Sequence, residues 1–191
     1  MESRILFLGP VGAGKTTAVR TISDINVVDT EARASDEVGK LKATTTVAMD
    51  MGVVQLGDDR VVLYGAPGQD RFDFMWDILL EQSDAVMLVL DHSAEDPVSD
   101  LSRHHTSLLR LSERRLPLVI GLTHTDRAPD RPLNIYNEYL HPWRARCGCV
   151  ACTPSVQPMD ARNRSDVRAV LVVLAALLDV AQRFAVKPCL A

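Results

Sequence analysis

The sequence has little of what marks an exported, membrane-spanning or nucleic-acid-binding protein. Its longest apolar run, residues 170–178, is far too short to cross a bilayer. Its net charge of -4 gives no hint of a surface for nucleic acid. The first residues lead into a strand pattern within a few positions and do not resemble a signal peptide. We therefore expect a cytoplasmic protein that binds neither nucleic acid nor a membrane.

Cysteine is also scarce, with four in the chain, and without an export signal this favours free thiols in a reducing compartment. Cys189 stands third from the end, whereas a prenylation box needs its cysteine fourth, so no lipid anchor is expected. Cys147, Cys149 and Cys152 suggest a metal cluster, but a zinc site normally needs a fourth ligand and two-residue spacing. A buried turn of small residues is the simpler interpretation.

Segments with strand and helix patterns alternate along the whole chain, without a repeat or linker. The expected strands are residues 4–8, 45–56, 60–64, 85–90, 118–122 and 156–159, and the expected helices are residues 17–22, 72–82, 97–114, 133–143 and 165–184. Residues 24–44 are polar and aperiodic, as in a loop. The pattern predicts one domain over residues 1–191, a doubly wound α/β fold with a mostly parallel six-stranded sheet. Its one antiparallel pair would join the second and third strands. The last helix is apolar on several faces, and burial in the core explains most of this. Apolar side chains that the core does not bury would form a surface for a partner.

The stretch GPVGAGKT, residues 9–16, is the strongest motif in the chain. It fits the phosphate-binding loop, or P-loop, and it lies between an expected strand and an expected helix, as that motif requires. Its glycines allow backbone N–H groups to face phosphate oxygens, and the helix N-terminus favours an anion. Lys15 would reach the β- and γ-phosphates, and the Thr16 hydroxyl would bind Mg²⁺. The residues expected at the phosphates are Gly9, Val11, Gly12, Ala13, Gly14, Lys15, Thr16 and Thr17.

Four more stretches distinguish among P-loop families. They are TTTV at residues 44–47, GAPGQDRF at 65–72, THTD at 123–126 and DAR at 160–162. With the P-loop, they make the chain resemble a bacterial Ras-like small GTPase, close to the group of the gliding-motility polarity GTPase. The resemblance runs from Ile5 to about Leu178. It implies a GTP/GDP switch with Mg²⁺, slow hydrolysis, an effector and an activating protein, which by resemblance would be a roadblock-type dimer.

The resemblance implies roles for the first two stretches, residues 44–47 and 65–72, which correspond to the family's two switch segments. Thr46, or alternatively Thr45, would bind Mg²⁺ and contact the γ-phosphate, so that the loop before it orders only with a triphosphate. The amide of Gly68 would contact the γ-phosphate, and Gln69 would orient the attacking water, with Lys15 as the other catalytic residue. Val11 stands where relatives commonly have glycine, and its branched side chain would crowd Gln69.

One position of the second switch stretch departs from the family pattern. The family's aspartate, which supports Mg²⁺, is Gly65 in this chain. Asp50 or Asp91 could take its place through a water molecule, and the sequence does not choose between them. The gliding-motility relatives lack the same aspartate, so its absence indicates a subgroup more than a dead site.

The last two stretches would form the base site. Asp126 matches the residue that accepts two hydrogen bonds from guanine, at N1–H and at the 2-amino group. Thr123 and His124 depart from the family's Asn-Lys, and we expect His124 to pack under the P-loop. The stretch Asp160-Ala161-Arg162 resembles the family's S-A-K, with the Ala161 amide donating to guanine O6.

Two other functions remain open from the sequence. A small-molecule kinase can begin with a similar P-loop, but it needs a lid with several arginines, and the arginines here are scattered. A pseudo-GTPase scaffold would bind nucleotide without turning it over, which Gly65 and the pair Thr123-His124 suggest.

Overall fold

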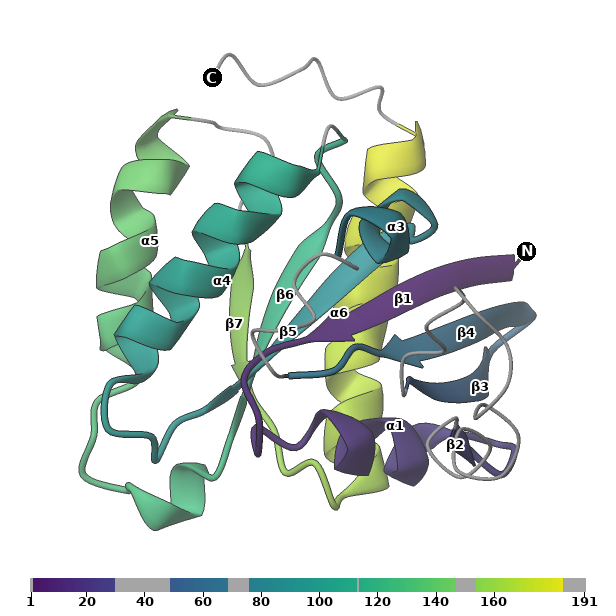
Figure 1. The fold of residues 1–191 in the computed structure, drawn as a ribbon, viewed down its shortest axis with the longest axis horizontal. Coiled ribbons are helices and arrows are strands. Elements are labelled where there is room, and N and C mark those ends of the chain that lie inside the picture. Colours follow the sequence, from purple (N-terminus) through teal and green to yellow (C-terminus); the bar gives the residue numbers. More distant parts are fainter. Residues whose placement is uncertain (1, 30–48, 69–75, 113, 147–153, 184–191) are drawn as a thin grey trace, which may run out of the picture.

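The computed structural model describes residues 2–29, 49–68, 76–112, 114–146 and 154–183 (Figure 1). The strands are β1 (Glu2–Leu8), β2 (Val28–Asp29), β3 (Asp50–Leu56), β4 (Asp59–Gly65), β5 (Ala85–Asp91), β6 (Leu118–Thr123) and β7 (Ser155–Pro158). The helices are α1 (Lys15–Ile22), α3 (Trp76–Glu81), α4 (Pro97–Leu111), α5 (Asn134–Arg146) and α6 (Arg164–Arg183), with a short 3₁₀ helix, η2 (Thr125–Arg127).

All seven strands form one sheet in the order β2-β3-β4-β1-β5-β6-β7. The pairs β4-β1, β1-β5, β5-β6 and β6-β7 are parallel, whereas β3 runs antiparallel to β4. This confirms the expected α/β fold, its mostly parallel sheet and its antiparallel pair. The two-residue strand β2 joins the six expected strands at the edge, also antiparallel to β3, within the segment expected to be a loop.

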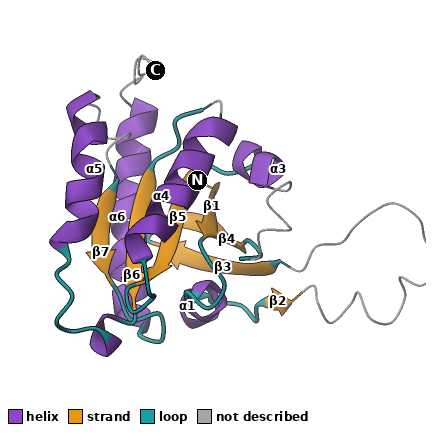
Figure 2. Ribbon diagram, turned by 60° about the vertical axis from the view of Figure 1, so that its left-hand side comes forward, coloured by secondary structure: helices purple, strands orange, loops and turns teal. Residues whose placement is uncertain are grey.

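Helices cover both faces of the sheet, as a buried parallel sheet requires (Figure 2). Successive side chains of a strand point to opposite faces, so β1 contributes to two cores. Ile5 and Phe7 pack with α1 and α6, whereas Leu6 and Leu8 pack with α3, α4 and α5. The apolar face of α6 therefore lies mostly in the core, although Val172 is half exposed. Among the described residues, no helix has the length and apolarity to span a membrane.

The ends of α4 show how local sequence sets a helix boundary. Asp96 caps the helix by accepting a hydrogen bond from the Ser99 N–H at 2.9 Å, and Pro97 occupies the first turn, where its missing N–H costs nothing. The helix ends at Leu111, earlier than expected, because Ser112 has an extended backbone.

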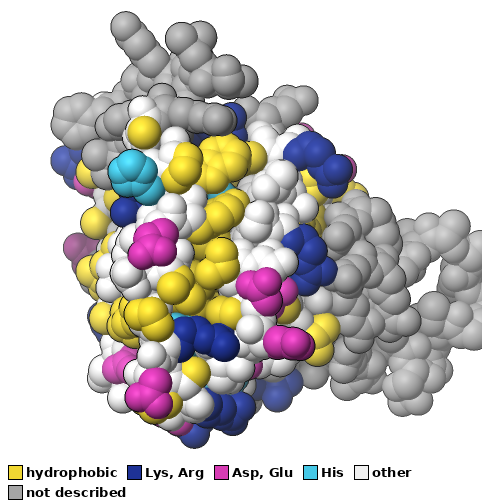
Figure 3. Space-filling model, turned by 90° about the vertical axis from the view of Figure 1, so that its left-hand side faces the viewer, with side chains coloured by type: hydrophobic (Ala, Val, Ile, Leu, Met, Phe, Trp, Pro, Cys, Tyr) yellow, Lys and Arg dark blue, Asp and Glu magenta, His cyan; other side chains and the backbone are white. Residues whose placement is uncertain are grey.

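The side of the molecule that α5 occupies in Figure 1 carries a band of apolar side chains between charged groups (Figure 3). On α5, Ile135, Tyr139 and Trp143 recur every fourth residue and are partly buried. The ring of Tyr139 and that of Trp143 pack edge-on against His105 of α4. Burial lowers the pKa of His105 to about 4, so this histidine is neutral at physiological pH.

The parallel strands place one edge of the sheet in position for a site. The strands β1, β5, β6 and β7 all end at this edge, at Leu8, Asp91, Thr123 and Pro158. In open α/β sheets, ligands bind outside the carboxyl ends of the strands, where neighbouring connections leave toward opposite faces. The motif residues found in the sequence follow these strand ends.

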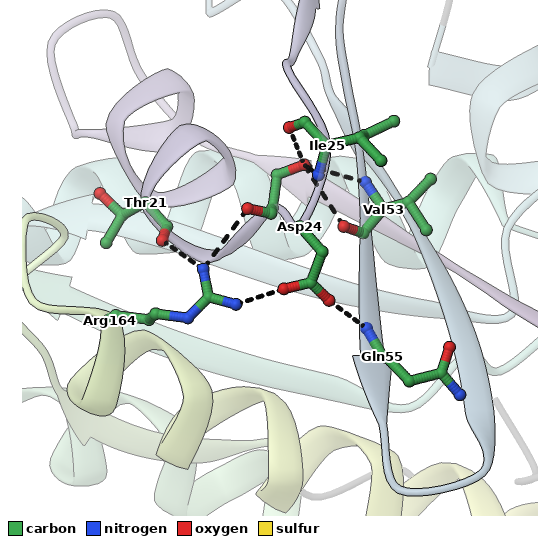
Figure 4. Close-up of polar contacts among 7 residues, drawn as sticks. Thr21, Asp24, Ile25, Val53, Gln55 and Arg164 are labelled. Carbon is green, nitrogen blue, oxygen red and sulfur yellow. Dashed lines mark hydrogen bonds and ion pairs between the residues drawn. The ribbon is translucent and has the colours of Figure 1, made fainter.

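Arg164, the first residue of α6, takes part in a hydrogen-bond network that connects three elements (Figure 4). Its guanidinium donates to the carbonyl of Thr21 at 3.1 Å and of Ser23 at 3.4 Å, near the end of α1, and pairs with the Asp24 carboxylate. The other Asp24 oxygen accepts from the Gln55 N–H of β3 at 2.7 Å, and this bond contributes most to lowering the pKa of Asp24. The network joins α1, β3 and α6.

We expect Arg164→Ala to lower the free energy of unfolding by about 1 kcal/mol, because a cation that satisfies carbonyls at a helix C-terminus is lost. Solvent exposure of the pair limits the effect. Urea denaturation measures the change. The control is Arg183→Ala, which breaks an exposed pair with Asp179 within α6 and should cost less than about 0.5 kcal/mol. Equal losses in both variants would contradict a special role for Arg164.

Candidate nucleotide site

The P-loop connects β1 to α1 at the centre of the sheet edge. Gly9 has a φ of 138°, and a Cβ there would lie 2.0 Å from the carbonyl oxygen of Val89 in β5. Gly14 has a φ of 93° and directly precedes the first residue of α1. Only glycine adopts both conformations without strain, so the motif glycines set the path of the loop.

Lys15 is buried at the start of α1, with its ammonium against the loop. The Nζ atom donates hydrogen bonds to the carbonyls of Gly9 and Pro10, each at 2.7 Å. An ammonium group has three N–H donors, so in the described part of the chain a third remains for a phosphate oxygen. Burial lowers the pKa of Lys15 to about 8, and the nearby Asp50 carboxylate partly offsets this shift. The group is a desolvated cation at the place where phosphates would bind.

Thr16 and Asp50 bring two oxygen atoms together beside Lys15. The Thr16 hydroxyl donates to Oδ2 of Asp50, at the start of β3, and Oδ1 of Asp50 lies 3.9 Å from the Arg20 guanidinium. Hydroxyl and carboxylate oxygens are ligands that Mg²⁺ accepts, so these residues fit the ion that the resemblance implies. Thr46, the other expected ligand, and its alternative Thr45 lie outside the described residues.

Gly68 lies against the P-loop. A Cβ at Gly68 would lie 2.5 Å from Nζ of Lys15 and 2.8 Å from the backbone nitrogen of Val11, so the position has no room for a side chain. The side chain of Val11 itself is 67% exposed. Gln69 follows Gly68 directly but lies outside the described residues.

A pocket of about 430 Å³ opens beside the P-loop, within the size range of small-molecule sites. It collects the expected base residues from three separate stretches of the chain. Its lining includes Gly14, Thr17, Thr123, His124, Asp126, Asp160, Ala161 and Arg162.

Thr123 joins the base pocket to the P-loop. Its buried hydroxyl lies 2.9 Å from the carbonyl of Ala13 and 3.1 Å from that of Leu90, so its proton has two acceptors. Thr123 thus anchors the P-loop through Ala13, a contact that the sequence did not indicate when it placed Thr123 in the base site.

The structure places His124, which the sequence assigns to the base site and to packing under the P-loop, beside Asp91. Its Nδ1 lies 3.1 Å from the Asp91 carboxylate and 3.2 Å from the Thr123 hydroxyl. The pairing of β5 with β6 causes this contact, because it places Asp91 directly beside Thr123, the residue before His124. His124 also has a φ of 54°, which turns the chain at the strand end.

Both carboxylate oxygens of Asp91 have neighbours at the sheet edge. One of its oxygens accepts from the Ser93 N–H at 2.8 Å and from the Ser93 hydroxyl at 2.6 Å, and the other faces His124. Although partial burial opposes ionisation, these bonds lower the pKa of Asp91 below its ordinary value. Of the two carboxylates left open by the sequence, Asp50 is the one beside Thr16.

The mouth of the pocket carries Asp126 and Arg162. Arg162 donates to both oxygens of Asp160, at 2.9 and 2.8 Å, and lies 4.0 Å from Asp126. The side-chain and backbone bonds from Arg162 lower the pKa of Asp160 to about 2. Asp166 in the first turn of α6 accepts from the Asp160 N–H at 3.1 Å and so anchors this loop. The carboxylate of Asp126 is 67% exposed.

Cys147, Cys149 and Cys152 lie outside the described residues. Within the described ranges, no three His, Cys, Asp or Glu side chains are grouped to hold a metal ion.

Comparison with known proteins finds a matching family and several similar proteins. Residues 24–143 match the model of a family described as "Conserved hypothetical ATP binding protein". An uncharacterized protein of Methanocaldococcus jannaschii is 25% identical over 138 residues, which is 71% of this chain and 79% of that protein. The rat ADP-ribosylation factor-related protein 1 is 28% identical over 102 residues, 52% of this chain; the match spans only 47% of that protein.

A solved structure has a similar fold. The translation elongation factor SelB from Methanococcus maripaludis, in complex with the GTP analogue GppNHp, superposes with a TM-score of 0.61 at 16% identity. The match covers 93% of this chain and 34% of the SelB chain. At this identity the likeness concerns the fold, which is that of a P-loop NTPase.

Proposed function

We propose that this chain, which belongs to the family described as "Conserved hypothetical ATP binding protein", is a guanine-nucleotide switch. The reason is that its P-loop adjoins a pocket lined by Asp126 and Ala161. The chain binds GTP with Mg²⁺ and hydrolyses it slowly to GDP and phosphate. The observation that carries the proposal is the pocket of about 430 Å³, in which the end of the P-loop meets Asp126 and Ala161.

The proposed chemistry relies on charge and position. Lys15 holds the β- and γ-phosphates with its ammonium, and P-loop amides donate to the remaining phosphate oxygens. Thr16 and Thr46 hold Mg²⁺, which when bound neutralises the charge that develops on the phosphates. Gln69 orients a water molecule for in-line attack, and the Gly68 amide donates to the γ-phosphate. Gly68 already lies against Lys15 and the P-loop, which supports this role.

The choice of guanine over adenine depends on Asp126 and the Ala161 amide. A carboxylate accepts from N1–H and from the 2-amino group of guanine, whereas adenine has no donor at either place. The family description names ATP, and a titration that compares GTP with ATP measures which base the pocket selects.

The proposed output is a surface formed by residues 24–46 and 65–72 that depends on the bound nucleotide. An effector would read it, and an activating protein, by resemblance a roadblock-type dimer, would accelerate hydrolysis. Kinship with the gliding-motility polarity GTPases and a cytoplasmic location belong to the same proposal.

A second function has a specific observation in its favour. Position 65 is glycine and the pair Thr123-His124 replaces the usual Asn-Lys, which suit a scaffold that binds nucleotide without turnover. Single-turnover hydrolysis of bound GTP distinguishes the two. Release of phosphate supports the switch, and persistence of GTP over many hours supports the scaffold.

We expect Gln69→Leu to slow single-turnover hydrolysis by roughly 100-fold, because the attacking water loses the group that orients it. GTP affinity should change little. The matched control is Gln82→Leu, an exposed glutamine at the end of α3, which should hydrolyse GTP at the wild-type rate. A Gln69→Leu rate equal to wild type would mean that another group positions the water.

A further inference from the structure

The antiparallel pair β3-β4 places Asp50 directly across from Gly65. Gly65 is the last residue of β4, and it occupies the position at which Ras-like relatives carry the aspartate that supports Mg²⁺. Asp50 is the first residue of β3, and the two form a cross-strand pair. Side chains of such pairs project to the same face of the sheet, so either residue could present a carboxylate there.

The Asp50 side chain occupies the space that a side chain at Gly65 would need. A Cβ built on Gly65 would lie 3.1 Å from Cβ of Asp50 and 3.3 Å from its Oδ2. This spacing is tighter than an ordinary van der Waals contact, so the two positions cannot both carry a large side chain without displacement. The missing carboxylate at position 65 and the carboxylate at position 50 are alternatives for one place.

The surroundings of that carboxylate are those of a cation site. The Asp50 side chain is only 12% exposed, and it faces the Thr16 hydroxyl and the Arg20 guanidinium. The Thr16 hydroxyl donates its single proton to Oδ2, so the lone pairs of its oxygen remain for a cation. Asp91, the other carboxylate at this edge, is engaged by Ser93 and His124.

We propose that Asp50 supplies from β3 the carboxylate that supports Mg²⁺, in place of the aspartate absent from position 65. Asp50 acts as a positioning residue, which orients the Thr16 hydroxyl and attracts the ion. The inference rests on the proposed function in one respect, that the site binds a guanine nucleotide with Mg²⁺. It also explains how a chain with glycine at position 65 keeps a competent metal site.

The test is the Mg²⁺ dependence of GDP release, which needs no hydrolysis. Fluorescent GDP is loaded, and its dissociation is followed over a range of free Mg²⁺. The removal of a group that orients a metal ligand typically weakens metal binding by about 10- to 100-fold. Asp50→Asn should therefore raise the Mg²⁺ concentration for half-maximal slowing of release by that factor. Asp58→Asn, with the same charge change in the exposed turn at the far end of β3 and β4, should leave it unchanged.

A relocation variant tests the shared place directly. Asp50→Gly should lose the Mg²⁺ effect, and Gly65→Asp alone should be crowded by Asp50. The double variant Asp50→Gly/Gly65→Asp should bring the Mg²⁺ midpoint back toward wild type. This rescue would show that Asp50→Gly fails for want of a carboxylate and not for want of a fold.

Two results would overturn the inference: an unchanged Mg²⁺ midpoint in folded Asp50→Asn, or no Mg²⁺ effect on release from the wild type. Wild-type protein that binds no guanine nucleotide at any Mg²⁺ concentration would instead overturn the proposed function and the inference with it.

Discussion

Lys15→Met should weaken GTP binding by roughly 150- to 5,000-fold, which corresponds to about 3–5 kcal/mol for the loss of one partner of a desolvated charge pair. Lys15 is buried, and its Nζ is held by two carbonyls of the P-loop, so the cation is already in position before phosphate arrives. Methionine keeps most of the apolar stem and removes the charge. Fluorescent GTP binding at fixed Mg²⁺ measures the loss.

The lysine should also give GTP binding a pH dependence. Because its pKa is lowered to about 8, the ammonium form is lost as the pH rises above that value, and phosphates bind the ammonium form. The affinity of wild type should therefore fall above pH 8 by up to about tenfold per pH unit. Lys15→Met should not show this fall. Arg183→Ala, which removes an exposed cation, is the control for net charge. Unchanged affinity in folded Lys15→Met would contradict the phosphate site itself.

Asp126→Asn should reduce GTP affinity by roughly 30- to 1,000-fold, or about 2–4 kcal/mol. Both carboxylate oxygens accept from guanine, whereas an asparagine NH₂ would face a donor and leave hydrogens opposed. Xanthine carries an oxygen in place of the 2-amino group, so the asparagine amide would donate to it. Affinity should pass from GTP to XTP, while ATP stays weak in both proteins because its 6-amino group faces the Ala161 amide.

Titration of wild type and variant with the three triphosphates measures this exchange. Asp130→Asn is the matched control, because it makes the same change in charge at an exposed residue four positions along the chain. Its preference should equal that of wild type. If wild type binds ATP as tightly as GTP, or if Asp126→Asn keeps its GTP affinity, Asp126 does not read the base. Only the proposed binding of the phosphates would then remain, without selectivity for guanine.

Much of the fold could be predicted from the sequence, because the segments with a strand or helix pattern are also the segments that the tertiary structure buries. The apolar runs that became β5 and β6 are buried on both faces, and a run of that kind favours a central parallel strand wherever the chain places it. The helices were predicted to within three residues of their ends, except that the expected start of α3, at residues 72–75, lies outside the described residues. The early end of α4 reflects the extended backbone of Ser112, which no periodicity reveals. The two-residue strand β2 was not predicted, since a ladder this short depends on β3 being beside it.

By itself, the sequence determined the P-loop, its lysine and the order of strands and helices, since each depends on residues close together in the chain. Which carboxylate lies beside Thr16 was decided only by the tertiary structure, because Asp50 and Gly65 become neighbours through the register of β3 against β4. The same holds for Thr123, whose hydroxyl lies below Ala13, and for His124, which turned to Asp91 across a strand pair. Contacts between distant residues depend on strand register and on the space that neighbouring side chains leave. Neither can be predicted from the local pattern of a single sequence.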